Sequence, residues 1–109
     1  MDLDVSVGPD VPAAVQVSAF RVVQEALTNV LKHSGAVAVR VVAHQDGRML
    51  DVGIDNGPAA AGHPPMPGAG LGLIGMRERV ALFGGTLQTG PRPGGGWRVS
   101  ATFPWEREP

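Results

Sequence analysis

The stretch that decides the fold is FRVVQEALTNVLKHSG, residues 20–35. At about 100° per residue, most of its apolar side chains fall on one arc of a helix and its polar side chains fall on the other. The predicted helix runs from Pro12 to His33, with Asp10 as its N-terminal cap and Gly35 as its C-terminal stop. Val22 breaks the pattern. The predicted apolar arc comprises Ala19, Phe20, Val23, Ala26, Leu27, Val30 and Leu31.

The polar side of this helix carries a row of three chemically useful groups. Glu25 and Asn29 are four residues apart, so their side chains lie one above the other, and Lys32 continues the row. An amide oxygen can bind magnesium, an ammonium group can neutralise a phosphate, and a carboxylate can polarise an attacking group. The alternative is a solvated surface network, which the three residues taken alone favour.

Alternating apolar residues predict strands on both sides of the helix. A half-buried strand is expected at Leu3–Val7. Two more are expected at Val37–Ala43 and Met49–Asp55, joined by a turn at Asp46-Gly47.

The last third predicts a short helix over Gly75–Phe83, ended by Gly84-Gly85, with its charged residues at a solvated helix start. Strands at Thr86–Thr89 and Trp97–Phe103 follow, joined across 91–96. These elements predict an α/β two-layer sandwich, a mixed sheet covered by helices on one face. The length of 109 residues suits a single domain over residues 1–109.

Composition excludes several classes of protein. A net charge of −1 gives no reason to expect a nucleic-acid partner. No apolar run is long enough to insert in a membrane, and the N-terminus lacks the pattern of a signal peptide. The absence of cysteine excludes disulfides and thiolate metal sites, which fits a reducing cytoplasm.

Asp55-Asn56-Gly57 follows a strand whose other face is apolar. An ionised carboxylate accepts hydrogen bonds and cannot donate them, so Asp55 suits the amino group of adenine and repels the carbonyl of guanine. The alternative is that these residues serve turn geometry alone.

A glycine run over 68–75 leads directly into the predicted second helix. Glycines let a backbone approach phosphates closely, and the first amides of a helix point at the anion. The run also matches a dinucleotide-binding pattern, but no buried strand precedes it. No acidic residue lies between Glu78 and Glu106, so the acid expected to bind a ribose is missing.

In this order, the three motifs resemble the ATP-binding fold shared by histidine kinases, type II topoisomerases, Hsp90-type chaperones and mismatch-repair ATPases. Residues 20–35 resemble the N box, residues 55–57 the first glycine box, and residues 68–85 the second glycine box. QEALTN followed by GLGLIGMRERV is typical of sensor histidine kinases of the nitrate-sensor type. The resemblance covers nearly the whole chain.

The resemblance implies a site for ATP and magnesium. It implies that Asn29 binds magnesium, that Lys32 contacts phosphate and that His33 lies near the ribose or phosphates. Asp55 would bind the adenine amino group, and Gly57 would keep the strand end close to the ring. Residues 57–70 would form a lid over the ATP. The second glycine box would add Gly68, Gly70, Leu71 and Gly72 to the nucleotide-binding set.

The resemblance also bears on catalysis and partners. Glu25 matches the position that serves as the base in the ATPase branches. None of His33, His44 and His63 has the sequence surroundings of a phosphoacceptor. The phosphoacceptor and dimerisation domain of the same kinase is therefore expected outside this chain, with a response regulator acting indirectly. The domain is expected in the cytoplasm, either free or as the cytoplasmic part of a membrane-bound sensor.

Two departures from the family pattern motivate an alternative function. Pro58-Ala59 replaces the usual continuation to a second glycine, and Trp97 stands where the last box usually has a threonine. This alternative is a degenerate module that acts as a protein-interaction domain. An anti-sigma-type serine kinase is a second alternative, which nothing in the sequence excludes.

Overall fold

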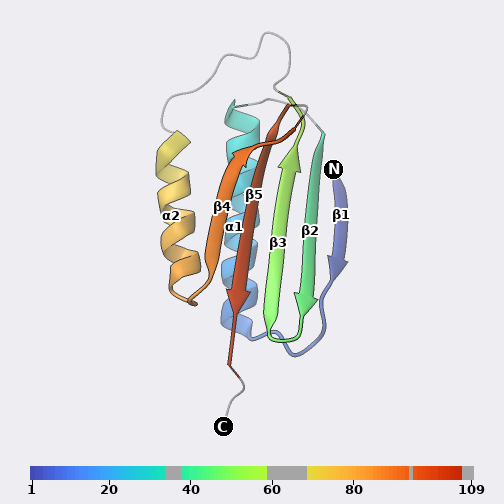
Figure 1. The fold of residues 1–109 in the computed structure, drawn as a ribbon, viewed down its shortest axis with the longest axis vertical. Helices are drawn as coiled ribbons and strands as arrows, with labels where there is room; N and C mark the ends of the chain where they lie inside the picture. The colour runs from blue at the N-terminus through green and yellow to red at the C-terminus, as the bar shows by residue number, and fades with distance from the viewer. Residues whose placement is uncertain (34–37, 59–68, 94, 107–109) are drawn as a thin grey trace.

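The computed structural model describes residues 1–33, 38–58, 69–93 and 95–106, and it describes the backbone alone at residues 33 and 69–73. In this part of the chain, one sheet has the strand order β1-β2-β3-β5-β4, and the helices α1 and α2 cover one of its faces (Figure 1). The elements in chain order are β1 (Asp2–Ser6), α1 (Ala13–His33), β2 (Val39–Asp46), β3 (Met49–Asn56), α2 (Ala69–Ala81), β4 (Thr86–Pro91) and β5 (Trp97–Pro104).

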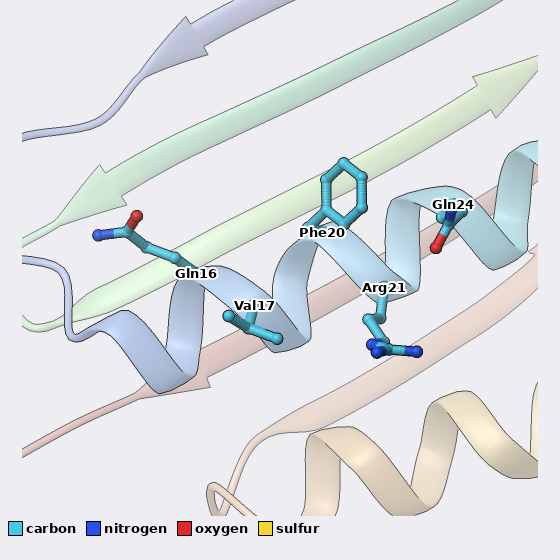
Figure 2. A pocket seen from close by; sticks show the side chains of 5 residues that line it. All are labelled: Gln16, Val17, Phe20, Arg21 and Gln24. Carbon is cyan, nitrogen blue, oxygen red and sulfur yellow. The ribbon is translucent and has the colours of Figure 1, made fainter.

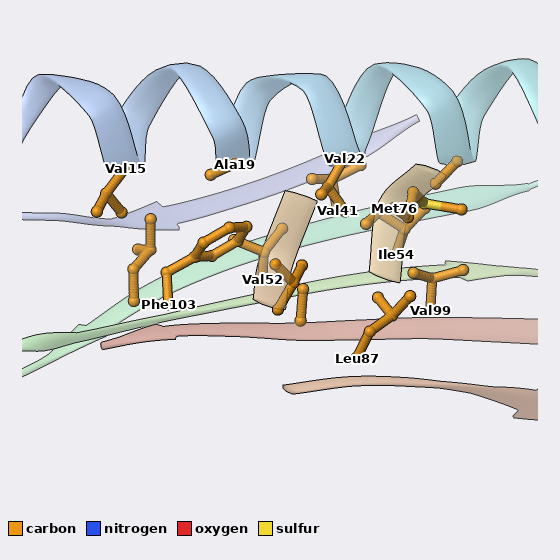
Figure 3. Close-up of a cluster of buried hydrophobic side chains, with 14 of the residues drawn as sticks. Val15, Ala19, Val22, Val41, Val52, Ile54, Met76, Leu87, Val99 and Phe103 are labelled. Carbon is orange, nitrogen blue, oxygen red and sulfur yellow. The ribbon is translucent and has the colours of Figure 1, made fainter. Parts of the chain in front are cut away.

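The sheet is mixed, as predicted. β1 runs parallel to β2, whereas β2, β3, β5 and β4 pair antiparallel with their neighbours. The core lies between the sheet and the helices, with α1 packed over β3 and β5 and α2 packed over β5 and β4 (Figure 3). The predicted two-layer α/β sandwich is confirmed. The largest fully buried side chains are Phe103, Ile54, Met76, Val15, Val22 and Val80.

The face of α1 that packs on the sheet differs from the predicted arc. Val22 is completely buried, whereas Phe20 and Leu31 are 65% and 66% exposed. The buried stripe comprises Val15, Ser18, Ala19, Val22, Ala26 and Val30. Ala19, Ala26 and Val30 of the predicted arc are buried as expected, but the stripe that meets the sheet is centred nearer Val22 than predicted. Apolar residues also lie outside this stripe, so hydrophobicity alone did not specify which side of α1 meets the sheet.

β1 pairs with β2 along its whole length but is exposed on both faces. Leu3 and Val5 are 64% and 63% exposed, so the prediction of a half-buried strand was wrong. β1 forms an edge of the sheet, and α1 packs over β3 and β5 further along it. Period-two alternation reports strand geometry, but burial also requires a covering layer.

α2 begins at Ala69, six residues before the predicted start, and therefore includes the glycines of the second glycine box. As predicted, Gly84 and Gly85 terminate the helix. The Gly85 amide donates to Val80 O at 3.2 Å and the Gly84 amide donates to Ala81 O at 3.0 Å, with Gly84 at a φ of 71°. This is the hydrogen-bond pattern of a Schellman cap. The expectation that Arg77, Glu78 and Arg79 form a helix start was wrong, because they lie in the second half of α2.

The two predicted hairpins are present. β2 and β3 are joined through Gly47 and Arg48, with Gly47 at a φ of 59°, where a two-residue hairpin of type II′ has glycine. β4 and β5 pair from Thr86 opposite Thr102 to Pro91 opposite Trp97. The four strands end one to three residues after their predicted ends, and β2 begins at Val39, two residues after its predicted start. Val37 lies outside the described residues.

Candidate functional site

One end of the sandwich brings together the C-terminal end of α1, the C-terminal end of β3, the start of β5 and the N-terminal end of α2 (Figure 1). The motifs singled out in the sequence occupy these four segments. The topology explains the convergence, because α1 and β3 both run toward this end and α2 starts from it.

The polar row on α1 reaches this end. Glu25 and Asn29 are half-buried, and Lys32 is exposed in the last turn of the helix. Ala26 and Val30 next to them belong to the stripe that packs on the sheet. The row therefore lies along the border between the helix layer and solvent, where a polar ligand can reach it. The structure describes His33 as the last residue of α1, without its side chain.

The first glycine box places its two polar side chains on opposite faces of β3. Leu50, Val52, Ile54 and Asn56 are all buried on the helix side, with Asn56 only 4% exposed. Asp55 lies between Ile54 and Asn56 and therefore points to the outer face, away from α1. The structure brings Asn56 toward the helix layer that carries Asn29 and does not bring Asp55 there.

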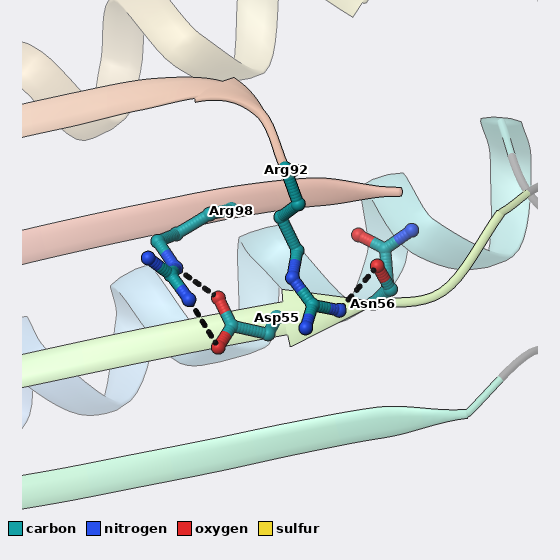
Figure 4. A network of polar contacts seen from close by, with 4 residues as sticks. All are labelled: Asp55, Asn56, Arg92 and Arg98. Carbon is teal, nitrogen blue, oxygen red and sulfur yellow. Dashed lines mark hydrogen bonds and ion pairs between the residues drawn. The ribbon is translucent and has the colours of Figure 1, made fainter. Parts of the chain in front are cut away.

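Asp55 takes part in an ion pair on the outer face (Figure 4). Arg98 of β5, its neighbour across the sheet, donates from Nε to Oδ1 at 2.6 Å and from Nη2 to Oδ2 at 3.3 Å. The hydrogen bond to Asp55 and the attraction of its charge raise the pKa of the Arg98 guanidinium above its ordinary value. On the other side, Arg40 of β2 is opposite Asp55 and lies 3.7 Å from Asp4. Asp55 is thus one member of a charged row across the outer face.

The backbone at the end of β3 is held from both sides. Arg92 donates from Nη1 to Asn56 O at 3.1 Å (Figure 4). The Gly57 amide donates to Ala38 O at 3.0 Å. Gly96, at a φ of 89°, packs so closely that a Cβ would collide with Asn56 O. The position of Asn56 is therefore fixed by contacts from β2, β5 and the β4–β5 connection.

Trp97 begins β5 directly opposite Asn56. Val99, Ala101 and Phe103 of the same strand are buried on the helix side, so alternation places Trp97 on that side as well. Unlike them, Trp97 is 41% exposed because it lies at the end of the strand. A partly open indole thus stands beside the buried Asn56 amide.

The second glycine box is helical where the structure describes it. Gly70, Leu71 and Gly72 lie in the first turn of α2, so their backbone amides belong to a helix N-terminus, the feature expected of a phosphate contact. Gly68 and most of the predicted lid, residues 59–68, lie outside the described residues.

Sequence reasoning missed a contact that fixes α2. Arg77 donates from Nη1 to Leu87 O at 3.2 Å and so ties α2 to β4. The signal would have been an arginine on the same helix face as Val80, at i and i+3. A shallow hollow on α1, lined by Gln16, Val17, Phe20, Arg21 and Gln24, lies on the side of the helix away from the core and holds none of the predicted site residues (Figure 2).

The donors at this end fit a hydrated magnesium ion bound to phosphates. The described residues contain no cluster of three or more His, Cys, Asp or Glu that could hold a metal by itself. Magnesium usually keeps several waters and takes one or two protein oxygens plus substrate phosphates. The half-buried amide of Asn29 offers a hard oxygen donor of that kind. In the described part of the chain, no helix is long and apolar enough to cross a membrane.

Comparison with known proteins identifies the family. Residues 14–107 match the family described as histidine kinase-, DNA gyrase B-, and HSP90-like ATPase. The signal transduction histidine-protein kinase/phosphatase UhpB of Salmonella typhimurium is 44% identical over 91 residues, which are 82% of this chain and 17% of UhpB. The nitrate/nitrite sensor protein NarQ of Escherichia coli is 39% identical over 93 residues, 84% of this chain and 16% of NarQ. The chain spans about a sixth of these relatives.

Solved structures share the fold. The blue-light activated histidine kinase of Erythrobacter litoralis EL346 aligns with a TM-score of 0.70 at 24% identity, over 94% of this chain and 35% of that one. Full-length ShkA, solved in complex with AMPPNP, aligns with a TM-score of 0.67 at 20% identity, over 94% of this chain and 25% of that one. The predicted resemblance to the ATP-binding domain of nitrate-sensor-type histidine kinases is confirmed.

Proposed function

Because this chain belongs to the family of histidine kinase-, DNA gyrase B- and HSP90-like ATPases, we propose that it binds Mg-ATP between its helix layer and the end of its sheet. We propose further that it transfers the γ-phosphoryl group to a histidine of a phosphoacceptor domain outside this chain. The observation that carries the proposal is the convergence of the C-terminal end of α1, the end of β3 and the start of α2 at one end of the sandwich (Figure 1). The last two turns of α1 contain Asn29 and Lys32.

The residues on α1 have complementary tasks in this proposal. Asn29 binds magnesium through its amide oxygen, and Lys32 neutralises phosphate charge from the exposed last turn. Bound magnesium would neutralise phosphate oxygens and so lower the barrier to transfer. His33 lies near the ribose or the phosphates of the bound nucleotide. The first turn of α2, with Gly70, Leu71 and Gly72, offers backbone amides to the phosphates, and Gly68 and Gly57 border the same nucleotide.

The proposed phosphoryl transfer breaks one bond and forms one bond. The bond between the γ-phosphorus and the bridging oxygen of ADP breaks, and a bond forms between phosphorus and a ring nitrogen of the acceptor histidine. The attacking nitrogen uses its lone pair, and the proton on the other ring nitrogen passes to a base, for which Glu25 is the candidate on this chain. Its half-buried position one turn before Asn29 puts the carboxylate next to the phosphate-binding groups.

The partners follow from the relatives. Two of them are named as sensor or signal-transduction proteins, and each extends far beyond the matched segment. We therefore propose that the phosphoacceptor and dimerisation domain of the same kinase binds this domain in the cytoplasm. A response regulator receives the phosphoryl group later.

The test is phosphoryl transfer to a supplied acceptor. The chain is incubated with ATP labelled at the γ-phosphate, alone and together with the phosphoacceptor domain of UhpB, a relative 44% identical in the ATPase segment. The proposal predicts acid-labile label on the acceptor histidine and none on this chain alone. Label on the isolated chain would contradict the proposal.

Substitution of the candidate base gives the matched test. Glu25→Gln keeps the size of the side chain and removes its basicity. We expect transfer slower by about 10²–10⁴-fold, with ATP affinity nearly unchanged, because general-base catalysis contributes on that scale. An equal rate in Glu25→Gln would assign the base to the acceptor domain instead.

One observation favours a second candidate function. Asp55, the expected adenine-binding residue, points to the outer face and is paired with Arg98. A module that has lost nucleotide binding and serves as a protein-interaction domain would tolerate this. Such a module would show no change in melting temperature on addition of Mg-ATP, whereas the kinase proposal requires one.

A further inference from the structure

We propose that Asn56 and Trp97 form the part of the site that recognises the nucleobase, in place of Asp55. The inference rests on the proposed nucleotide binding and names the residues that set its base specificity. It follows from the face of the sheet on which each side chain lies.

A nucleotide that contacts Asn29 and the start of α2 must lie on the helix side of the sheet. α1 packs on that side through Ala26 and Val30, which flank Asn29 in the sequence. Asp55 lies on the other face of β3, so the strand itself separates its carboxylate from such a ligand. To reach the ligand, Asp55 would also have to leave Arg98.

Asn56, unlike Asp55, lies on the helix side of the sheet. It is the last member of the inward row on β3, and it places an amide where Leu50, Val52 and Ile54 place aliphatic groups. Its Nδ2 donates to Gly57 O at 2.9 Å, and its own carbonyl is held by Arg92. A buried polar side chain on a fixed backbone is a preorganised recognition group.

Trp97 supplies a flat apolar surface beside it. The two residues are directly opposite each other in β3 and β5, and directly opposite side chains on one face lie within contact distance. The indole is 41% exposed at the end of the core. An amide that can read the edge of a base, next to an aromatic ring that can cover its face, is a pair used elsewhere to hold bases.

The amide predicts a base preference unlike that of a carboxylate. An amide can accept from the amino group of adenine and donate to a ring nitrogen, and after a flip it can serve guanine as well. The bond to Gly57 O favours one orientation, so we expect ATP to bind more tightly than GTP by about tenfold or less. A carboxylate at this position would repel the guanine carbonyl.

The test measures Kd for Mg-ATP and Mg-GTP in four proteins: the wild type, Asn56→Asp, Asp55→Asn, and Asp51→Asn as the control. Asp51 lies on the same outer face of β3 as Asp55. We expect Asn56→Asp to raise the preference for ATP by about tenfold or more, and both outer-face variants to bind like the wild type. Loss of ATP affinity in Asp55→Asn, with Asn56→Asp unchanged, would overturn the inference. A wild type that binds neither nucleotide would instead reject the proposed function.

A second readout does not depend on whether Asn56→Asp folds. The chain has two tryptophans, and Trp105 packs against the core beyond the end of β5 remote from Asn56. In a Trp105→Phe background, Trp97 is the sole tryptophan. The inference predicts that Mg-ATP changes its fluorescence intensity or emission maximum in a saturable manner, with the Kd found for the wild type. Saturable binding without any change in Trp97 emission would remove Trp97 from the base site.

Discussion

At the residue scale, alternation along β3 decides which of two neighbouring polar side chains can meet a ligand. The apolar residues at 50, 52 and 54 share one face, and that pattern was visible in the sequence. It already placed Asp55 on the opposite face and Asn56 on the same one. The family resemblance drew attention to the aspartate, whereas the periodicity, followed one residue further, points to the asparagine.

The charge pair on the outer face contributes to stability in a limited way. Arg98→Gln should lower the melting temperature slightly, and the difference should shrink in 1 M salt, because exposed ion pairs are weak and screened. A raised pKa means that the charged form of Arg98 stabilises the fold at every pH below the ordinary arginine pKa and is lost only above it. The effect on melting should therefore be constant from about pH 6 to 9. A large, salt-independent loss would contradict this account.

The backbone behind Asn56 should tolerate no side chain at residue 96. Gly96→Ala places a Cβ against Asn56 O at a φ of 89°, and we expect a loss of at least about 1–3 kcal/mol in the free energy of unfolding. Gly47→Ala is the matched control, since its φ of 59° is also positive but nothing lies within 4 Å of the added Cβ. That variant should lose only about 1–2 kcal/mol, the cost of a left-handed backbone at a residue with a Cβ. Denaturant unfolding of both variants would measure the difference, and equal losses would show that contact with Asn56 is not the cause.

At the element scale, α1 is the strongest prediction from sequence and also the one with the clearest error. Its existence, length and polar row of Glu25, Asn29 and Lys32 were predicted from the sequence. The predicted cap was wrong, because the helix begins at Ala13 and the Asp10 Oδ1 accepts from Gln45 Nε2 at 2.8 Å. The side that packs on the sheet was not fully predicted, because both sides carry apolar residues. The buried side of α1 is determined by its packing on β3 and β5, which no local sequence pattern specifies.

Substitutions on the buried and the exposed side of α1 should differ in their effect on the free energy of unfolding. Val22→Ala removes two methyl groups from a completely buried site and should cost about 1–3 kcal/mol of unfolding free energy. Phe20→Ala removes a larger side chain from an exposed site and should change stability by less than about 0.5 kcal/mol. Urea denaturation of the two variants measures both values. A larger loss in Phe20→Ala would restore the arc predicted from sequence.

α2 shows a different limit of sequence reasoning. Glycines have low helix propensity, so the run before Gly75 was predicted as a loop. In the structure it is the first part of the helix, held through Met76 and Val80 in the core. The end of the helix was predictable because its Gly84-Gly85 cap is a local signal, whereas the start depends on packing.

At the scale of the whole molecule, the pattern of elements predicted the fold class and the order of motifs predicted the family. α1 and β3 run toward the same end of the sandwich, and α2 starts there. This arrangement brings together three motifs that are distant in sequence. The exposed edge strand β1 could not be predicted as exposed, because its own alternation contains no information about how far the helices extend across the sheet.

The measurement that tests the central claim most directly is the melting temperature of the chain titrated with Mg-ATP, for the wild type and for Asn29→Ala, with excess EDTA as the control. At about 100 times the Kd, bound nucleotide should add roughly 2.7 kcal/mol, which is a rise of about 10 °C or more in a domain of this size. We predict that rise for the wild type, most of it lost in EDTA and in Asn29→Ala, with both proteins melting alike without nucleotide. A cooperatively melting wild type with no rise, or an equal rise in Asn29→Ala, would contradict nucleotide binding at this end of the sandwich.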